Sequence, residues 1–119
     1  MLNIVRAKYL LDATDQVAGR LATKVAILLM GKNVASYRPN YDHGATVEIT
    51  NVSKLKFTGK KMIDNVTRTF SGYPGGLKTT PLAKSFENDP CKVFKRIISN
   101  MLPKNKLRPK MLKRLHLNK

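Results

Sequence analysis

The sequence has few of the features that define several common protein classes. Its single cysteine, Cys91, excludes an intramolecular disulfide and a multi-cysteine metal site, which fits a reducing compartment. No apolar run approaches the roughly 18 residues that a membrane-spanning helix needs. Acidic side chains are also scarce, with 7 Asp and Glu in 119 residues. A disulfide scaffold and a membrane-spanning protein are therefore excluded, and we expect a soluble protein.

Positive charge is what the chain has in excess. It carries 23 Lys and Arg, a formal net charge of +16, and 42% hydrophobic residues. This length and apolar content predict one domain over residues 1–119, with a core at about 9–103 and a basic arm at about 104–119. The charge favours nucleic acid as the partner, because neutralised phosphates release condensed counterions. Anionic membranes and acidic proteins are weaker alternatives, and composition does not separate RNA from DNA.

The first thirty residues predict a strand followed by a helix. Tyr9–Leu11 is a short apolar run that is typical of a buried strand. Either Thr14 or Asp15 can cap the helix that follows, and Gly31 can end it. Apolar residues recur along this helix at the spacing of one face, so we expect that face to lie against the core.

Three later segments alternate apolar and polar residues, as half-buried strands do. They are Thr46–Thr50, Lys54–Thr58 and Val66–Phe70. Residues 33–44, before the first of them, are polar, aromatic and rich in turn formers, which predicts a surface loop. Together with Tyr9–Leu11 these segments give four expected strands.

Two further helices are predicted near residues 80 and 90. Thr80-Pro81 and Asp89-Pro90 each combine a capping side chain with proline at the first helical position. The second helix has an apolar inner face and ends before Pro103. Its outward face is basic, with Lys92, Lys95 and Arg96. Strands that alternate with helices favour an α/β layered domain.

The basic tail after Pro103 contains no acidic residue. It is either a solvated tail or an arm that becomes ordered against a phosphate backbone. Leu107, Met111, Leu112 and Leu115 indicate that part of it packs against the core.

Two basic, glycine-containing turns are candidate phosphate contacts. Thr58–Lys61 and Ser71–Lys78 place backbone amides beside lysine, although glycine and proline are also ordinary turn residues. The second turn resembles a nucleotide-binding P-loop, but Leu77 stands where that motif requires glycine. A nucleotide-dependent enzyme is therefore the alternative from a different class, and nucleotide binding abolished by Lys78→Ala would support it.

The sequence predicts no catalytic or metal site. His43 and His116 stand apart without ligand spacing, and Cys91 lacks a nucleophile motif around it. The seven carboxylates form no recognisable acid–base pair. We therefore expect no enzyme activity, no metal or cofactor, and no small-molecule substrate.

Four blocks, read in order, resemble the large-subunit ribosomal protein thirteen family of bacterial or organellar type. They are YLLDATDQVAGRLATKVAILLMGK, NVSKLKFTGKK, SGYPGGLK and MLPKNKL, within a match from about Tyr9 to Leu115. The resemblance implies a three-layer α/β/α domain around a small, largely parallel sheet. With the four strands expected above, this sheet would be four-stranded. It also implies a structural, non-catalytic constituent of the large ribosomal subunit that binds large-subunit ribosomal RNA and aids early assembly.

Further expectations follow from this resemblance. The partners would be large-subunit ribosomal RNA and neighbouring ribosomal proteins, in the bacterial cytoplasm or in a mitochondrion or plastid. An RNA-binding regulator of translation that acts off the ribosome is the alternative. The resemblance implies RNA contacts in the first helix, in both basic turns and after Pro103, and the charge pattern selects the same segments. The predicted RNA-binding residues are Arg20, Lys24, Arg38, Thr58, Gly59, Lys60, Lys61, Arg68, Ser71, Gly72, Tyr73, Gly75, Gly76, Lys78, Lys104, Lys106, Arg108, Lys110, Lys113 and Arg114.

Overall fold

A three-stranded parallel sheet forms one half of the molecule. The computed structural model describes residues 5–119, in which β1 (Lys8–Asp12), β2 (Thr46–Thr50) and β5 (Leu115–Leu117) pair in the order β1-β2-β5. Tyr9 lies opposite Val47, and Val47 lies opposite Leu115. The prediction of parallel pairing is confirmed, but the sheet has three strands rather than the four expected.

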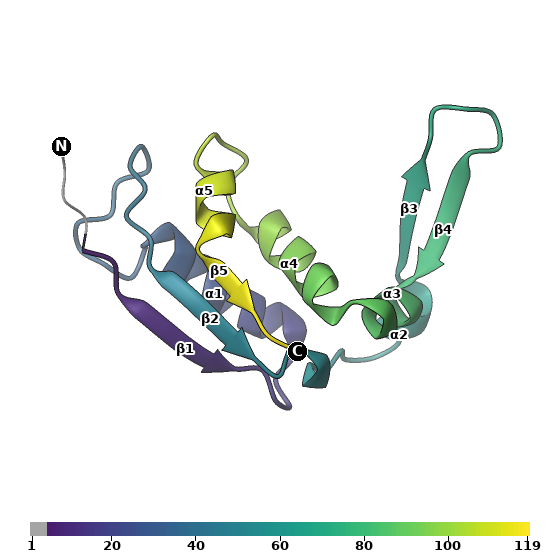
Figure 1. Cartoon of the computed structure of the whole chain (residues 1–119), viewed down its shortest axis with the longest axis horizontal. Helices are drawn as coiled ribbons and strands as arrows, with labels where there is room; N and C mark the ends of the chain where they lie inside the picture. The colour runs from purple at the N-terminus through teal and green to yellow at the C-terminus, as the bar shows by residue number, and fades with distance from the viewer. Residues whose placement is uncertain (1–4) are drawn as a thin grey trace.

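Helices α1 (Ala18–Met30) and α4 (Pro90–Met101) cover one face of this sheet (Figure 1). Val47 and Ile49 of β2 are fully buried against the two helices, and Phe94 is the largest fully buried side chain. Leu10 points to the other face and is 69% exposed. Within residues 5–119 the sheet therefore has helices on one side only, and the third layer expected from the resemblance is not observed.

The connection from β1 to α1 differs from its prediction. Val17 occupies the N-cap of α1 without a side-chain bond, so neither Thr14 nor Asp15 caps the helix. The backbone N–H and the hydroxyl of Thr14 instead donate to Asp12 Oδ1, at 3.0 and 2.7 Å. A local Asx-type turn thus competes successfully with the capping role.

Two other helix ends agree with the sequence. Gly31 ends α1 in the left-handed conformation, with φ 80°, and its N–H donates to the carbonyl of Ile27. Asp89 caps α4 by accepting the backbone N–H of Lys92 at 3.1 Å, and Pro90 follows at the first helical position. The partners of Gly31 and Asp89 lie within four residues of them, and the sequence predicted both caps correctly.

The predicted strand at Lys54–Thr58 is wrong. The 3₁₀ helix η1 (Val52–Lys54) occupies its start, and one isolated bridge joins Lys56 to Val17. The alternation of this segment is nevertheless real, because Leu55 is buried and Phe57 meets Phe86 edge-on at a ring distance of 5.3 Å. Side-chain burial produced the pattern without strand pairing.

Strands β3 (Val66–Phe70) and β4 (Leu77–Pro81) form an antiparallel hairpin separate from the main sheet. The short helix α2 (Lys61–Asp64) precedes this hairpin, and α3 (Leu82–Asn88) follows it. The second strand was not predicted. Thr80 and Pro81 belong to it, so the helix expected to begin at Pro81 begins at Leu82, and Thr80 does not cap it. Figure 1 shows the hairpin projecting away from the sheet. The radius of gyration is accordingly 16.0 Å, compared with about 13.5 Å for a compact chain of this length.

The last sixteen residues contain a helix and a sheet strand. Helix α5 (Arg108–Lys113) leads into β5, and Met111 and Leu115 are both buried in the core. The prediction that part of the basic tail packs is thus confirmed. The side chain of Asn105 organises the start of this region by accepting the backbone N–H groups of Leu107 and Arg108.

Candidate nucleic-acid interface

The tip of the hairpin is built by glycine. Gly72 and Gly75 have φ values of 88° and 75°, the left-handed conformation that other residues rarely adopt. Gly76 serves a different purpose, because a Cβ at that position would lie 2.0 Å from Ser71 Oγ. Tyr73 is 75% exposed between these glycines. The exposed ring of Tyr73 and the exposed backbone therefore lie at the hairpin tip, which projects beyond the body of the protein (Figure 1).

The two hairpin strands expose apolar and basic side chains together. Phe70 pairs with Leu77, and Arg68, two residues before Phe70, shares their side of the ribbon. Phe70 is 66% exposed and Leu77 is 59% exposed, while Lys78 is exposed on the opposite side. An isolated two-stranded hairpin is only marginally stable in water. Its exposed aromatic and cationic side chains match a partner with stacked bases and phosphates.

The basic turn Thr58–Lys61 lies at the base of the hairpin. All four of its residues are exposed, and its last residue begins α2. Asn65, directly after α2, accepts the backbone N–H of Leu82 at 2.9 Å, which joins this region to the far end of β4. The two predicted turns therefore lie at opposite ends of the hairpin, about 17 Å apart for strands of this length.

The remaining candidates are spread over the other half of the molecule. Arg20 and Lys24 are exposed on α1, and Arg38 is exposed in the loop of residues 33–44. The structure confirms that loop as an irregular surface segment, and Figure 1 shows it at the end opposite the hairpin. These residues do not join the hairpin in one patch.

The C-terminal candidates surround helix α5. Lys104 and Lys106 are exposed before it, Lys110 and Lys113 are exposed on it, and Arg108 is partly buried at its start. Figure 1 shows α4 between this region and the hairpin. The basic tail thus forms a second positive region on a fixed scaffold.

Arg114 differs from every other candidate, because its guanidinium is used inside the protein. It donates to the carbonyls of Ala45 and Leu29, at 3.0 and 3.2 Å, and pairs with the carboxylate of Asp42. The side chain is only 12% exposed, and this burial lowers the pKa of Arg114 from its ordinary value. These contacts join the end of α5 to α1 and to the loop before β2, and leave little of the side chain for a partner.

The other predicted cations have no acidic neighbour. Within residues 5–119, ion pairs occur at Arg6, Lys8, Lys56 and Arg114. Every other predicted arginine and lysine lacks a carboxylate within 4 Å in that part of the chain. Their positive charge is not used in ion pairs within this part of the protein, so it is available to a polyanion.

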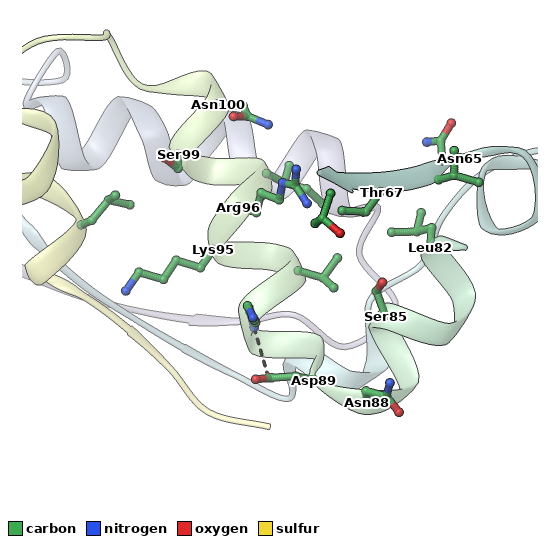
Figure 2. Close-up of a pocket in the computed structure, with 16 residues that line it drawn as sticks. Asn65, Thr67, Leu82, Ser85, Asn88, Asp89, Lys95, Arg96, Ser99 and Asn100 are labelled. Carbon is green, nitrogen blue, oxygen red and sulfur yellow. Dashed lines mark hydrogen bonds between the residues drawn. The ribbon is translucent and has the colours of Figure 1, made fainter. Parts of the chain in front are cut away.

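Helix α4 adds a basic surface that the predicted site left out. Lys92, Lys95 and Arg96 are all exposed, as its amphipathic pattern indicated. They line a groove between α4 and the hairpin, drawn in Figure 2. The sequence places these three cations within five residues, and that density could have indicated the surface. They were left out of the predicted site because no glycine-containing turn lies beside them.

Neither a metal site nor a membrane helix is found in the described part of the chain. No group of three His, Cys, Asp or Glu side chains in residues 5–119 could hold a metal ion. None of the helices in this range is long and apolar enough to cross a membrane.

The fold and its exposed cations define a small, basic α/β protein. A sequence model of the family described as ribosomal protein L13 matches residues 6–119. The chain belongs to the ribosomal protein L13 family, which is a family of structural proteins rather than enzymes. The family resemblance found in its four sequence blocks is thereby confirmed.

Three bacterial relatives show the extent of this similarity. The protein of Pelobacter propionicus is 45% identical over 113 residues, which cover 95% of this chain and 80% of that protein. The protein of Thermotoga maritima is 43% identical over 112 residues, covering 94% and 75%. That of Lactobacillus johnsonii is 41% identical over 114 residues, covering 96% and 78%. Each is named large ribosomal subunit protein uL13.

Proposed function

We propose that this chain is a structural constituent of the large ribosomal subunit that binds large-subunit ribosomal RNA and aids early assembly. The observation that carries this proposal is the L13 family match over residues 6–119. The exposed cations without acidic neighbours supply the physical mechanism, because they can neutralise phosphates of separate RNA segments. Neighbouring ribosomal proteins complete the proposed environment, in a bacterial or organellar ribosome.

The proposed RNA contacts fall into three groups. The hairpin supplies Arg68, Lys78 and the tip at Ser71–Gly76, and the Thr58–Lys61 turn supplies its base. Arg20, Lys24 and Arg38 extend the contact to the sheet half, and the cations around α5 form the third group. Arg114 is omitted, since its hydrogen bonds are made to Asp42 and to backbone carbonyls. Spacing of the groups along a 50 Å molecule suits a protein that holds RNA segments together.

Salt dependence of binding tests this mechanism. If about 6 to 10 phosphates are neutralised, the plot of log affinity for large-subunit RNA against log salt should have a slope of about −5 to −9. Binding of purified protein to ribosomal RNA fragments would be measured from about 50 to 200 mM salt. A flat response would contradict the phosphate mechanism. A tight complex with one messenger RNA, and none with ribosomal RNA, would favour regulation off the ribosome.

The Thr58–Lys61 turn is tested by replacing both lysines. We expect Lys60→Ala with Lys61→Ala to weaken RNA binding about tenfold and to reduce the magnitude of the salt slope by up to about 1.8, because two phosphate contacts are lost. Thermal unfolding should be unchanged, since both side chains are exposed.

The matched control for that pair is Lys8→Ala with Lys56→Ala. It also removes two positive charges, but from side chains that pair with Glu48 at 3.0 Å and Asp15 at 3.4 Å. Equal losses of affinity in the two double variants would mean that net charge, rather than the turn, determines binding.

A further inference from the structure

A groove of about 1000 Å³ lies between the hairpin and helix α4 (Figure 2). Residues at the base of β3 form one wall, and α3 and α4 form the others. Its volume is at the upper end of the range for pockets that hold small molecules. It therefore has room for a few nucleotides of a single strand, but not for a duplex.

One wall of the groove carries a row of donor side chains. Lys92, Arg96 and Asn100 follow one another at intervals of four residues, so they lie on the same side of α4. Lys95 lies beside this row. Figure 2 shows Arg96 on α4 across the groove from Thr67 on the hairpin. The three cations are exposed and, within residues 5–119, have no carboxylate within 4 Å.

The lining contains one acidic residue, Asp89. Its carboxylate accepts the backbone N–H of Lys92 at 3.1 Å, the bond drawn as a dashed line in Figure 2, and so caps the start of α4. Three cations against one capping carboxylate leave the groove positive. This balance favours an anionic occupant over a basic one.

Three asparagine side chains lie around the rim. Asn65, Asn88 and Asn100 are exposed, and their amide groups make no hydrogen bond within the described residues 5–119. An amide offers both donors and an acceptor, as the edge of an unpaired base requires. Among the residues at 5–119 that line the groove none is aromatic, so bases would be contacted at their edges and not by stacking.

We propose that this groove holds a single-stranded segment of RNA, with Lys92 and Arg96 on its phosphates and the asparagine amides at base edges. The proposal rests on the ribosomal RNA-binding function proposed above and adds a second kind of contact to it. The hairpin tip presents Tyr73 for stacking, whereas the groove would hold the strand between α4 and the hairpin.

Two kinds of variant test the groove in the whole 119-residue chain. Lys92→Ala with Arg96→Ala removes the proposed phosphate contacts and should weaken binding to large-subunit RNA at least about tenfold, with a shallower salt slope. Thr67→Trp fills the groove without changing the charge, and tryptophan is compatible with a strand. Asn100→Trp fills it from the opposite wall on an exposed helix position. Both should weaken RNA binding while leaving thermal unfolding of the protein unchanged.

The control for the charge effect is again Lys8→Ala with Lys56→Ala, which should retain most of the affinity. If wild-type protein binds RNA with a steep salt slope and the three groove variants do so equally well, the groove is not an RNA site, and the proposed function is unaffected. If the groove variants bind naked RNA normally but fail to enter the large subunit, the occupant is a protein segment, which also overturns the inference. Absence of RNA binding by the wild-type protein would remove the proposed function itself.

Discussion

Strands β1 and β2 of the main sheet and both strands of the β3–β4 hairpin are five residues long and alternate similarly, but only the sheet forms a core. In β2, Val47 and Ile49 are fully buried, whereas β3 and β4 contain no buried residue. The difference is the presence of α1 and α4, which cover one face of the sheet (Figure 1). A pattern of alternation therefore makes a core only where another element covers the apolar face.

This contrast separates stability from binding along the chain. Burial of apolar surface in the sheet half supplies most of the free energy that maintains the fold. The hairpin contributes little to it, and keeps Phe70, Tyr73 and Leu77 in solvent in the free protein. Substitutions in the sheet half should accordingly lower the free energy of unfolding, whereas substitutions in the hairpin should mainly lower the affinity for RNA.

The strongest test of the contrast compares two phenylalanines. Phe94→Ala should lower the free energy of unfolding by about 3 to 5 kcal/mol, because it leaves a cavity in the core. Phe70→Ala, at a side chain that is 66% exposed, should change it by less than about 1 kcal/mol and weaken RNA binding instead. Urea unfolding and RNA titration of both variants would measure this. Similar destabilisation by the two substitutions would show that the hairpin is part of the cooperative core.

A smaller effect is expected where the basic C-terminal region meets the core. Arg114→Met removes the partner of Asp42 and the donors to two backbone carbonyls, and should cost about 3 kcal/mol of unfolding free energy. Lys113→Met is the matched control. Lys113 directly precedes Arg114 and its side chain is exposed, so its replacement should change stability little. Thermal unfolding would measure both. An unchanged midpoint for Arg114→Met would show that the internal network does not stabilise the fold.

Arg114 also shows which part of the site the sequence could not predict. It stands in a run of basic residues and differs from them through its partners Ala45, Asp42 and Leu29, which are 69, 72 and 85 positions away. Charge density along the chain cannot distinguish a cation that faces solvent from one with such a distant partner. The exposure of Lys60 and Lys61 was expected from the basic turn that contains them, and both side chains are exposed.

The same distinction applies to the fold. Asp89 and Gly31 were assigned correctly because a helix cap depends on residues three or four positions away. The pairing of Val66–Phe70 with Leu77–Pro81 was missed, since Thr80-Pro81 has the composition of a helix start. The three-residue strand β5 was missed within a basic tail, because its place in the sheet depends on pairing with β2. Local rules therefore located these two caps, although they failed at the start of α1, while strand partners required the tertiary structure.

The smallest predicted effect concerns Asp12, at the end of β1 in the sheet half. Hydrogen bonds from Thr14, and a further one from Asn51 at 3.1 Å, lower the pKa of Asp12 to about 2. The unfolded chain should titrate near about 3.9. The contribution of Asp12 to stability is therefore complete above about pH 4 and is lost as pH falls towards 2, because the folded state then gives up a favourable charge.

Asp12→Asn should flatten the dependence of stability on pH in that interval while keeping an oxygen that can accept from Thr14. The pKa would be measured by carboxyl NMR titration, and the slope by urea unfolding at several pH values. Asp64→Asn is the matched control for loss of one negative charge, since no hydrogen bond to its carboxylate is found in residues 5–119. If Asp12 titrates near 4 in the folded protein, the polar connection between β1 and α1 is open in solution. The core would then be stabilised by apolar packing alone. The difference between the sheet and the hairpin would come from the helices that cover the sheet, and the polar turn between β1 and α1 would add nothing to it.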